Sequence, residues 1–324
     1  MAAGGEGSAV EPAAVDLSVR LGRVELANPL LTASGTFGYG LEFGHLAALP
    51  RLGGLVTKGL SLEPIPGNPP PRICETRGGM LNSIGLQNIG IESFVADVLP
   101  GLQDFDARVI VNLFGTSIEE YARLAARVDG EAGIAAVELN VSCPNVKRGG
   151  IQFGHDPRLL AELVAAVRAQ TTKPIAVKLS PNVTSPTELG LAARDAGADI
   201  LSAINTVVGM AIDSRTRRPL LHTVRGGLSG PAIKPIALRI VFDVARAVGL
   251  PVIGIGGIET VDDVLEFLLA GASAVQVGTA LFRDPRTPER ILDGLTQRLA
   301  AEGVSSVGEL IGAVRLDPED GAGV

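Results

Sequence analysis

One segment near the C-terminal end of the chain reads Val252-Ile253-Gly254-Ile255-Gly256-Gly257, a continuous apolar run that stops at two glycines. Thr260 follows, with Asp263 three residues later, a pattern that starts a helix. A second apolar run then ends at Gly278 and Thr279. A strand, a helix and another strand in this order predict one unit of a parallel β-sheet.

The same alternation extends over most of the chain. The predicted strands are Leu30–Ala33, Leu55–Lys58, Val109–Leu113, Ala136–Val141, Ile175–Leu179, Ile200–Asn205, Val252–Ile255 and Ala274–Val277. Most are continuous apolar runs, which is typical of strands that are buried on both faces. Eight such units favour an α/β fold of the closed (β/α)8 TIM barrel type over an open doubly wound sheet.

Three other helices have recognisable first turns. Ser117 is followed by Glu120, and Ser185 by Glu188, which we interpret as N-caps of the capping-box type. Asp156-Pro157 opens a third helix, because proline is favoured at the first helical position. These helices are expected to connect neighbouring strands.

The composition is that of a globular protein. The chain has 324 residues, of which 46 % are hydrophobic and 19 % charged, which supplies a large buried core. We predict a single catalytic barrel domain over residues 15–315, flanked by a flexible N-terminal tail at 1–14 and a C-terminal tail at 316–324. The net charge of -7 argues against a nucleic-acid-binding surface.

Targeting and metal-binding signals are missing from the sequence. The first residues lack the basic start and apolar middle of a signal peptide, and no apolar run reaches membrane-spanning length. Two cysteines cannot supply the four thiolates of an iron–sulfur cluster, and three histidines show no zinc-type spacing. We therefore expect a soluble cytoplasmic protein that carries no metal and binds neither membrane nor nucleic acid.

Two connections are too long for plain βα loops. They cover residues 59–90 and 207–231, and both begin at the carboxyl end of a predicted strand. Barrel enzymes build their sites from the loops at that end. We expect these inserted loops to shape a pocket or meet a partner, although their outer parts fit plain surface loops as well.

Polar residues or glycines follow nearly every predicted strand, at the end where a barrel ligand must lie. They are Ser34, Lys58, Gly59, Asn112, Asn140, Cys143, Asn145, Lys178, Asn205, Thr206, Gly256, Gly257, Gly278 and Thr279. Glycines after the last two strands allow backbone N–H groups to cradle a phosphate, although glycine is also common in ordinary turns. Glu259 breaks the G-x-G-x-x-G spacing, so no dinucleotide fold is indicated.

Cys143 is the strongest candidate for chemistry. It lies between two carboxamides, those of Asn140 and Asn145, directly after an apolar run. A thiol can remove a proton, and the amides can hold a flat, amide-rich substrate. The alternative is a small buried apolar residue, but Pro144 ends the strand and keeps the thiol near a loop.

Two lysines at the strand ends admit two roles. Lys58 or Lys178 can form a Schiff base, or can stay cationic and stabilise negative charge that develops on a cofactor ring. The group of asparagines around them favours the second role, because amides recognise a neutral amide edge but catalyse little themselves.

Taken together, these residues resemble the soluble class 1 dihydroorotate dehydrogenases, in the NAD-linked (class 1B) branch. The resemblance runs from the Leu30–Gly35 strand to Gly278-Thr279. The matching motifs are Thr57-Lys58-Gly59, Asn82-Ser83-Ile84-Gly85-Leu86-Gln87-Asn88, Ile204-Asn205-Thr206, Gly226-Gly227-Leu228-Ser229-Gly230, and the Cys143 segment continuing through Val146-Lys147-Arg148-Gly149-Gly150-Ile151-Gln152-Phe153-Gly154. The last continuation is similar to the NAD-linked branch rather than the fumarate-linked one.

The resemblance implies FMN, one per chain, and a dihydroorotate site. FMN is expected to contact Ser34, Lys58, Gly59, Asn112, Asn140, Lys178, Ile204, Gly230, Gly256, Gly257, Gly278 and Thr279. Dihydroorotate is expected to contact Lys58, Asn82, Ser83, Ile84, Gly85, Leu86, Asn140, Asn145, Asn205 and Thr206. Cys143 is expected to take the C5 proton while the C6 hydrogen leaves as hydride to FMN, and Lys178 to stabilise the reduced ring.

The resemblance also implies a partner. FAD and a [2Fe–2S] cluster are expected on an electron-transfer subunit that passes electrons to NAD, in a heterotetramer built on a homodimer of catalytic chains. The sequence differs from the membrane-bound class in two ways: it has Cys143 where that class has a serine, and it lacks an apolar amphipathic N-terminal extension. Quinone is therefore an unfavourable electron acceptor. The alternatives are a homodimer that reduces fumarate, a Schiff-base aldolase that uses Lys178, and a barrel that only binds a phosphorylated ligand.

Overall fold

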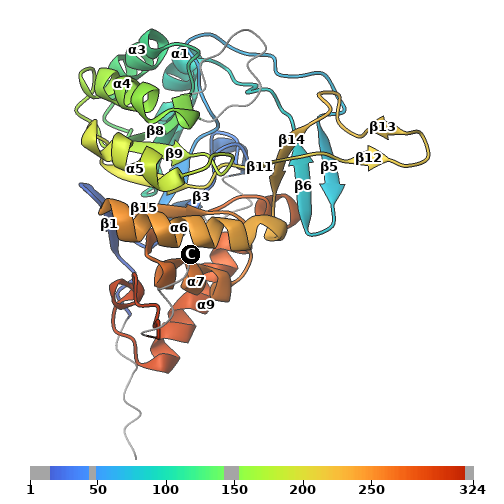
Figure 1. The fold of residues 1–324 in the computed structure, drawn as a ribbon. Coiled ribbons are helices and arrows are strands. Elements are labelled where there is room, and N and C mark those ends of the chain that lie inside the picture. The colour runs from blue at the N-terminus through green and yellow to red at the C-terminus, as the bar shows by residue number, and fades with distance from the viewer. Residues whose placement is uncertain (1–14, 44–48, 142–152, 318–324) are drawn as a thin grey trace, which may run out of the picture.

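The computed structural model describes residues 15–43, 49–141 and 153–317, and eight parallel strands within them close into a barrel (Figure 1). In spatial order the strands are β3 (Leu30–Thr32), β4 (Gly54–Val56), β7 (Arg108–Leu113), β8 (Ala136–Asn140), β9 (Ile175–Leu179), β10 (Ile200–Ala203), β15 (Val252–Ile255) and β16 (Ala272–Val277). The barrel closes where Val275 of β16 pairs with Leu30 of β3. The predicted TIM barrel is therefore confirmed.

The predicted strands all occur, with small differences at their ends. β4 and β10 each stop two residues before the predicted ends at Lys58 and Asn205. The Asn205 backbone N–H still donates to the Leu179 carbonyl at 3.0 Å, so the chain stays close to the barrel beyond the strand. Both side chains therefore belong to the loops at the barrel mouth.

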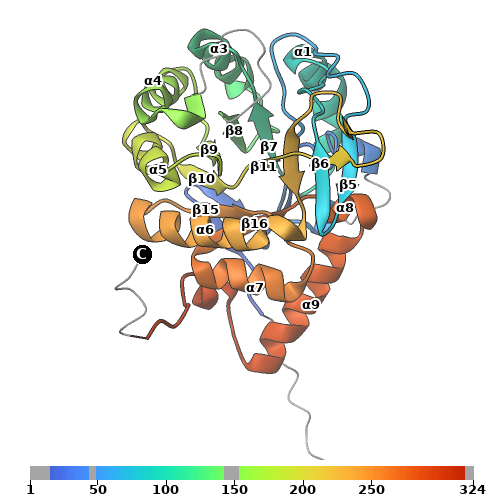
Figure 2. The same cartoon turned by 45° about the vertical axis from the view of Figure 1, so that its right-hand side comes forward.

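Helices surround the barrel, as Figure 2 shows from a second direction. The described helices are α1 (Ile91–Ser93), which continues through a π-helical turn (Phe94–Val98) into α2 (Leu99–Leu102), then α3 (Ile118–Asp129), α4 (Pro157–Arg168), α5 (Pro186–Asp195), α6 (Lys234–Val248), α7 (Val261–Ala270), α8 (Ala280–Arg283) and α9 (Thr287–Glu302). On α4, the apolar residues Leu160, Leu163, Val164 and Val167 recur at helical spacing and are fully buried. The outer layer thus packs one apolar face of each long helix against the strands.

The helix starts agree with the predicted N-caps, but not with the predicted capping boxes. Ser117 and Ser185 each accept a hydrogen bond from the backbone N–H three residues on. The acid three residues after Ser117 binds Thr116 instead of closing a box. Reciprocal pairs occur at Thr260 and Asp263, where the shorter Asp side chain reaches back to the Thr260 N–H, and at Ser306 and Glu309.

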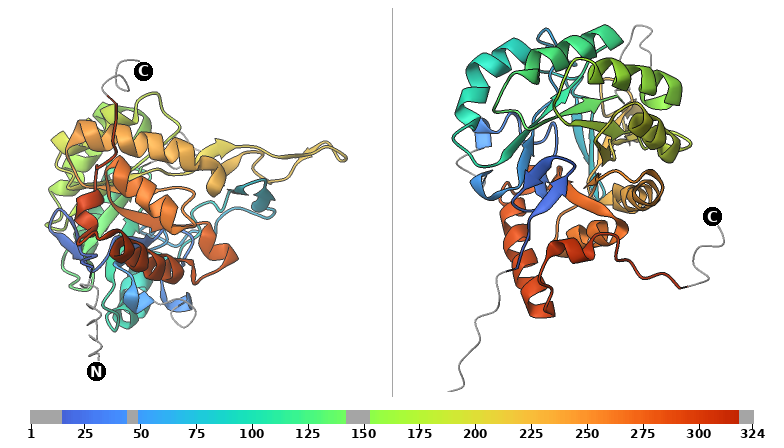
Figure 3. Two further views of the ribbon diagram at one scale, coloured as in Figure 1. Left: turned by 90° about the horizontal axis from the view of Figure 1, so that it is seen from below. Right: turned by 90° about the vertical axis from the view of Figure 1, so that its left-hand side faces the viewer.

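A hairpin lies across the end of the barrel at which the strands begin. Its strands are β1 (Val19–Leu21) and β2 (Val24–Leu26) (Figure 3, right). Their apolar side chains are buried. In the described part of the chain, no helix has both the length and the apolar character needed to cross a bilayer. The opposite end of the barrel is left for the inserted segments.

Both inserted segments contain strands that were predicted as loops. β5 (Ile73–Thr76) and β6 (Gly79–Asn82) of the first pair with β11 (Val207–Gly209) and β14 (Gly226–Ser229) of the second, in the order β11-β14-β6-β5. We call this antiparallel sheet the mouth sheet. A further pair, β12 (Ile212–Asp213) and β13 (Arg218–Pro219), forms an arm that projects away from the barrel (Figure 1, right; Figure 3, left).

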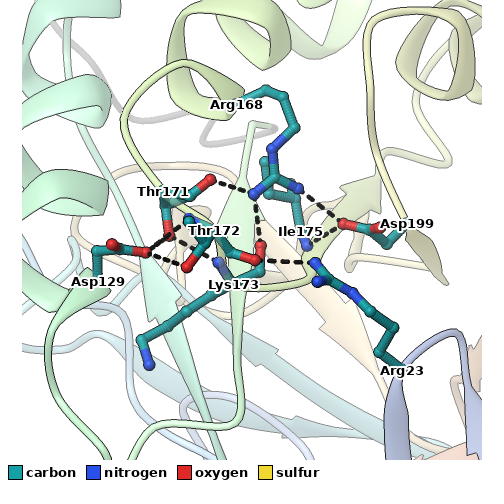
Figure 4. Close-up of polar contacts among 8 residues, drawn as sticks. All are labelled: Arg23, Asp129, Arg168, Thr171, Thr172, Lys173, Ile175 and Asp199. Atoms are coloured by element: carbon teal, nitrogen blue, oxygen red, sulfur yellow. Dashed lines mark hydrogen bonds and ion pairs between the residues drawn. The ribbon is translucent and has the colours of Figure 1, made fainter.

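A polar cluster fixes the turn between α4 and β9 at the base of the barrel (Figure 4). The Arg168 guanidinium donates to the carbonyls of Thr171 and Lys173 and to Asp199, whose Oδ2 also accepts from the Ile175 N–H at 2.9 Å. Charged hydrogen bonds to partly buried carbonyls are stronger than those between neutral groups. One side chain therefore connects α4, the turn and the start of β9.

On the other side of this turn, Asp129 at the end of α3 accepts hydrogen bonds from Thr171 Oγ1 at 2.7 Å and from the Thr172 N–H at 2.6 Å. These hydrogen bonds hold the pKa of the Asp129 carboxyl below its usual range. Arg23 of the base hairpin reaches the Thr172 carbonyl at 2.8 Å. The cluster therefore joins two barrel helices, a strand and the hairpin.

We expect Arg168→Ala to lower the free energy of unfolding by about 1–3 kcal/mol, because it leaves two carbonyls and the Asp199 carboxylate without a charged donor. The measurement is urea unfolding followed by circular dichroism. The matched control is Arg158→Ala on the same helix, whose side chain is 89 % exposed and whose ion pair with Asp156 is 3.6 Å long. Equal losses in both variants would contradict the role of Arg168.

Candidate active site

A cavity of about 370 Å³ opens at the carboxyl ends of the barrel strands, beneath the mouth sheet. This volume lies in the range of small-molecule and cofactor sites. Most of the predicted site residues line it: Ser34, Lys58, Gly59, Asn82, Ile84, Gly85, Leu86, Asn140, Lys178, Ile204, Asn205, Thr206, Gly230, Gly256, Gly257, Gly278 and Thr279. The fold thus brings together residues from both insertions and from the strand ends.

Two predicted site residues lie away from the cavity lining, and two others fall outside the described residues. Asn112 and Ser83 are buried and do not line the cavity. Ser83 instead holds the insertion together, because its backbone donates to the Arg72 carbonyl at 2.8 Å. Cys143 and Asn145 lie outside the described residues, so their predicted roles stay predictions.

The glycines at one end of the cavity are required by the backbone. Gly257 has a φ of 73°, and an added Cβ would lie 2.8 Å from the Lys234 Cβ and 2.9 Å from the Gly230 carbonyl oxygen. The hydroxyl of Thr279 donates to Ser229 Oγ at 2.8 Å. Backbone and hydroxyl groups are therefore exposed to the cavity at this end, which suits a phosphate.

The amide side chains at the other end of the cavity are oriented by neighbours. Asn205 Nδ2 donates to Asn140 Oδ1 at 3.2 Å, and Asn205 Oδ1 accepts from the Thr206 N–H at 2.9 Å. The Asn140 carbonyl accepts from Tyr121 Oη at 2.7 Å. Asn82 Nδ2 donates to the Gly227 carbonyl at 3.3 Å, across the mouth sheet. Fixed amides of this kind suit a flat ligand with its own amide edges.

Two cations line the cavity on one side, Lys58 just after β4 and Arg72 in the first insertion. Lys58 is partly buried, and burial lowers the pKa of its ammonium group, with the nearby charge of Arg72 adding to the effect. Arg72 donates to Gln87 Oε1 at 2.7 Å and lines the cavity. A positive region of this kind favours an anionic ligand. Sequence reasoning missed Arg72, because no local pattern distinguishes it from a solvent-exposed arginine.

A further residue of this region that was not predicted is Glu138, a fully buried acid on β8. Its Oε1 accepts from Asn112 Nδ2 at 2.7 Å, and its Oε2 accepts from Ser202 Oγ at 2.8 Å and Gln276 Nε2 at 2.9 Å. Lys178 Nζ lies 3.9 Å from Oε1. The available signal was an acidic residue inside an apolar strand, two positions before Asn140 and therefore on the same face.

The arrangement fits FMN on three observations. The glycine-lined end suits the phosphate, and Lys178 reaches the cavity from β9 as a cation. Asn112 Oδ1 is buried and has no hydrogen-bond partner among the described residues. This oxygen lies next to Gly59, only 2.9 Å from where a Cβ would be if that residue had a side chain. An unsatisfied buried acceptor beside a cavity-lining glycine suits a ligand that carries a donor. Within the described ranges, no three His, Cys, Asp or Glu residues gather as a metal site.

Comparisons with known proteins agree with this geometry. A family model described as dihydroorotate dehydrogenase matches residues 16–299. A protein of Geotalea daltonii named dihydroorotate dehydrogenase B (NAD(+)), catalytic subunit, is 56 % identical over 93 % of this chain and 99 % of its own length. A protein of the same name from Geobacter sulfurreducens is 58 % identical with the same coverage.

A solved structure shares the fold at lower sequence identity. It is a dihydroorotate dehydrogenase from Eimeria tenella in complex with ferulenol, with a TM-score of 0.78 and 22 % identity, covering 92 % of this chain and 88 % of that one. The family match spans most of the chain and the bacterial relatives match over almost their whole length. The chain belongs to the dihydroorotate dehydrogenase family.

Proposed function

We propose that this chain oxidises (S)-dihydroorotate to orotate in pyrimidine biosynthesis and delivers the electrons to NAD through a partner subunit. One observation carries the proposal: relatives more than half identical over nearly the whole chain are named NAD-linked catalytic subunits. The cavity supports it, because it combines a glycine-lined end, oriented amides and cations. The products are orotate and, through the partner, NADH.

FMN is the proposed cofactor of this cavity. The residues that would hold its phosphate are Gly256, Gly257, Gly278 and Thr279. Those that would hold the ring and ribityl chain are Ser34, Lys58, Gly59, Asn112, Asn140, Lys178, Ile204 and Gly230. When bound, FMN supplies an acceptor for the hydride that leaves C6 of dihydroorotate. Lys178 supports that transfer by holding positive charge at the cavity wall.

The amide residues and Lys58 would bind the substrate. Asn82, Asn140, Asn145, Asn205 and Thr206 offer donors and acceptors to the amide edges of the pyrimidine, with the 83–86 segment alongside. Lys58 would attract the carboxylate while protonated, and its lowered pKa means that this attraction fades at a lower pH than for an exposed lysine.

Cys143 would act as the base. It removes the C5 proton as the C6 hydride departs, and the two electrons of the C5–H bond form the C5=C6 double bond of orotate. The residue lies in the segment after β8, and Asn140 at the end of that strand lines the cavity. Cys143 therefore follows a cavity-lining residue by three positions in the sequence, which supports the proposal.

The partner is proposed to carry FAD and a [2Fe–2S] cluster. The relatives named catalytic subunit support a separate electron-transfer chain. This chain has two cysteines, fewer than the four that such a cluster needs, and no dinucleotide fingerprint. The cluster and the NAD site would therefore reside on the other subunit.

The arm offers a surface for assembly into a heterotetramer of two catalytic and two electron-transfer chains. Met210 and Ile212 are 47 % and 58 % exposed, and Val208 and Leu220 beside them are also exposed. An apolar cluster on a projecting hairpin is typical of a protein interface. We assign the arm to contacts between the catalytic chains.

The purified chain is expected to be yellow and to bleach when dihydroorotate is added without oxygen, because the bound FMN is reduced. An absorbance spectrum near 450 nm, the region of the oxidised flavin band, checks this. Adding fumarate to the bleached protein should not restore the colour, whereas NAD should do so only with the partner subunit. A colourless protein that borohydride traps covalently with substrate would instead indicate the aldolase alternative.

Replacing Cys143 with Ser should slow flavin reduction by about 10²–10⁴-fold, the usual contribution of a general base. In the unmodified chain the rate should rise with pH towards the thiol pKa of about 8.5, because only the thiolate accepts the proton. Stopped-flow absorbance between pH 6 and 9 measures both effects. Cys74→Ser is the matched control and should leave the rate unchanged, since Cys74 lies on β5 outside the cavity lining.

The double variant Met210→Asp with Ile212→Asp should weaken association of the catalytic chains by about tenfold or more, because it places charges in an apolar interface. Light scattering coupled to size-exclusion chromatography over a dilution series reports the mass. Val314→Asp, at an exposed site near the C-terminus, should leave the mass unchanged. An unaltered mass in the double variant would remove the arm from the interface.

A further inference from the structure

The Glu138 carboxylate is the centre of a buried polar cluster that the proposed chemistry does not use directly. Its residue lies on β8, and the four partners come from β7, β9, β10 and β16. Glu138 is fully buried and does not line the cavity. It contacts two residues that are proposed to hold the flavin: Asn112, whose Oδ1 lies beside the cavity-lining Gly59, and Lys178, which lines the cavity.

The fold alone does not explain a charge at this position. The neighbours of Glu138 on its strand, Val137 and Leu139, are fully buried apolar residues. Burying a carboxylate is unfavourable until its partners compensate for the lost water, and apolar side chains of similar volume often stabilise a core equally well. Two of the partners of Glu138, Asn112 and Lys178, are proposed to hold the flavin, which makes a role in the site the better explanation for this buried acid.

Glu138 determines which end of the Asn112 amide faces the cavity side. A carboxylate only accepts hydrogen bonds, so Nδ2 of Asn112 must point towards it, as the 2.7 Å contact shows. Oδ1 is then directed away, towards Gly59, which lines the cavity. The Glu138 carboxylate thereby makes Asn112 turn its Oδ1 acceptor, rather than its Nδ2 donor, towards that side of the site.

Glu138 also moderates the charge of Lys178. The distance of 3.9 Å between Nζ and Oε1 allows an ion pair but is too long for a hydrogen bond. Lys178 Nζ makes no hydrogen bond to any described side chain or backbone group, so its donors remain available to a ligand in the cavity. The negative charge behind it offsets part of its field at the cavity wall.

We infer that Glu138 is a positioning residue that orients the Asn112 amide and partly offsets the positive charge of Lys178. In this way it sets how strongly the site favours reduced over oxidised flavin. This inference rests on the proposed FMN site and deepens it. Reduction adds negative charge to the flavin ring. A carboxylate behind Lys178 lowers the preference for that charge, so its removal must raise the preference.

Replacing Glu138 with Gln should therefore raise the flavin midpoint potential. The expected change is about tenfold in the ratio of the dissociation constants for oxidised and reduced flavin, which is about 30 mV for a two-electron couple. Anaerobic reductive titration against a reference dye measures the potential independently of turnover. An unchanged potential in a variant that binds flavin like the unmodified chain overturns the inference.

Ser202→Ala is a second variant, for which the flavin midpoint potential is expected to shift in the opposite direction. This variant removes one hydrogen-bond donor from Glu138 Oε2 and keeps the carboxylate, so the negative charge of Glu138 is less screened. The flavin midpoint potential should therefore fall, by an amount that corresponds to about a two- to threefold change in the ratio of the two dissociation constants. A merely structural disturbance would move both variants in one direction. If Glu138→Gln does not fold, Ser202→Ala decides alone, and a rise or no change in its potential overturns the inference.

Asp199→Asn is the matched control for charge. It removes one negative charge from the base of the same barrel, where Asp199 binds Arg168, and should leave the potential unchanged. A shift equal to that of Glu138→Gln would show a general charge effect and overturn the inference. Failure of the proposed function is distinguishable, because the unmodified chain would then bind no flavin, or its bound flavin would not bleach when dihydroorotate is added.

Discussion

The pairing of the last barrel strand with the first is the constraint on which the rest of the structure depends. Val275, Gln276 and Val277 of β16 lie beside Leu30, Leu31 and Thr32 of β3, which joins segments more than two hundred residues apart. Because all eight strands are parallel, closure brings their carboxyl ends to one mouth. The amides, lysines and glycines of the cavity meet there for that reason, although they are scattered along the chain.

Closure also creates the closed interior in which Glu138 lies. An acid on an open sheet would find water, whereas inside the barrel it must be satisfied by side chains from other strands. The partners from β7, β10 and β16 complete that requirement. Asn112 and Lys178 therefore connect the buried polar cluster inside the barrel to the cavity, because both contact Glu138.

The features that depend on local sequence could be predicted, and those that depend on distant pairing could not. Barrel strands and N-caps such as Ser117 follow from short apolar runs and single side chains. The mouth sheet could not be foreseen, because Leu81 of β6 pairs with Leu228 of β14 and neither segment signals the other. Glu138 was missed because its strand was interpreted by overall apolarity, which hides the alternation between faces. The ligand roles of the cavity residues came from resemblance rather than from composition or spacing.

The mouth sheet has a consequence for how such a protein can change over evolutionary time. Its two inner strands come one from each insertion, with Asn82 of β6 opposite Gly227 of β14. Deleting either segment would expose the ladder of the other and displace its cavity-lining residues. The two insertions are thus expected to be kept or lost together during evolution, and a deletion in one requires a compensating change in the other.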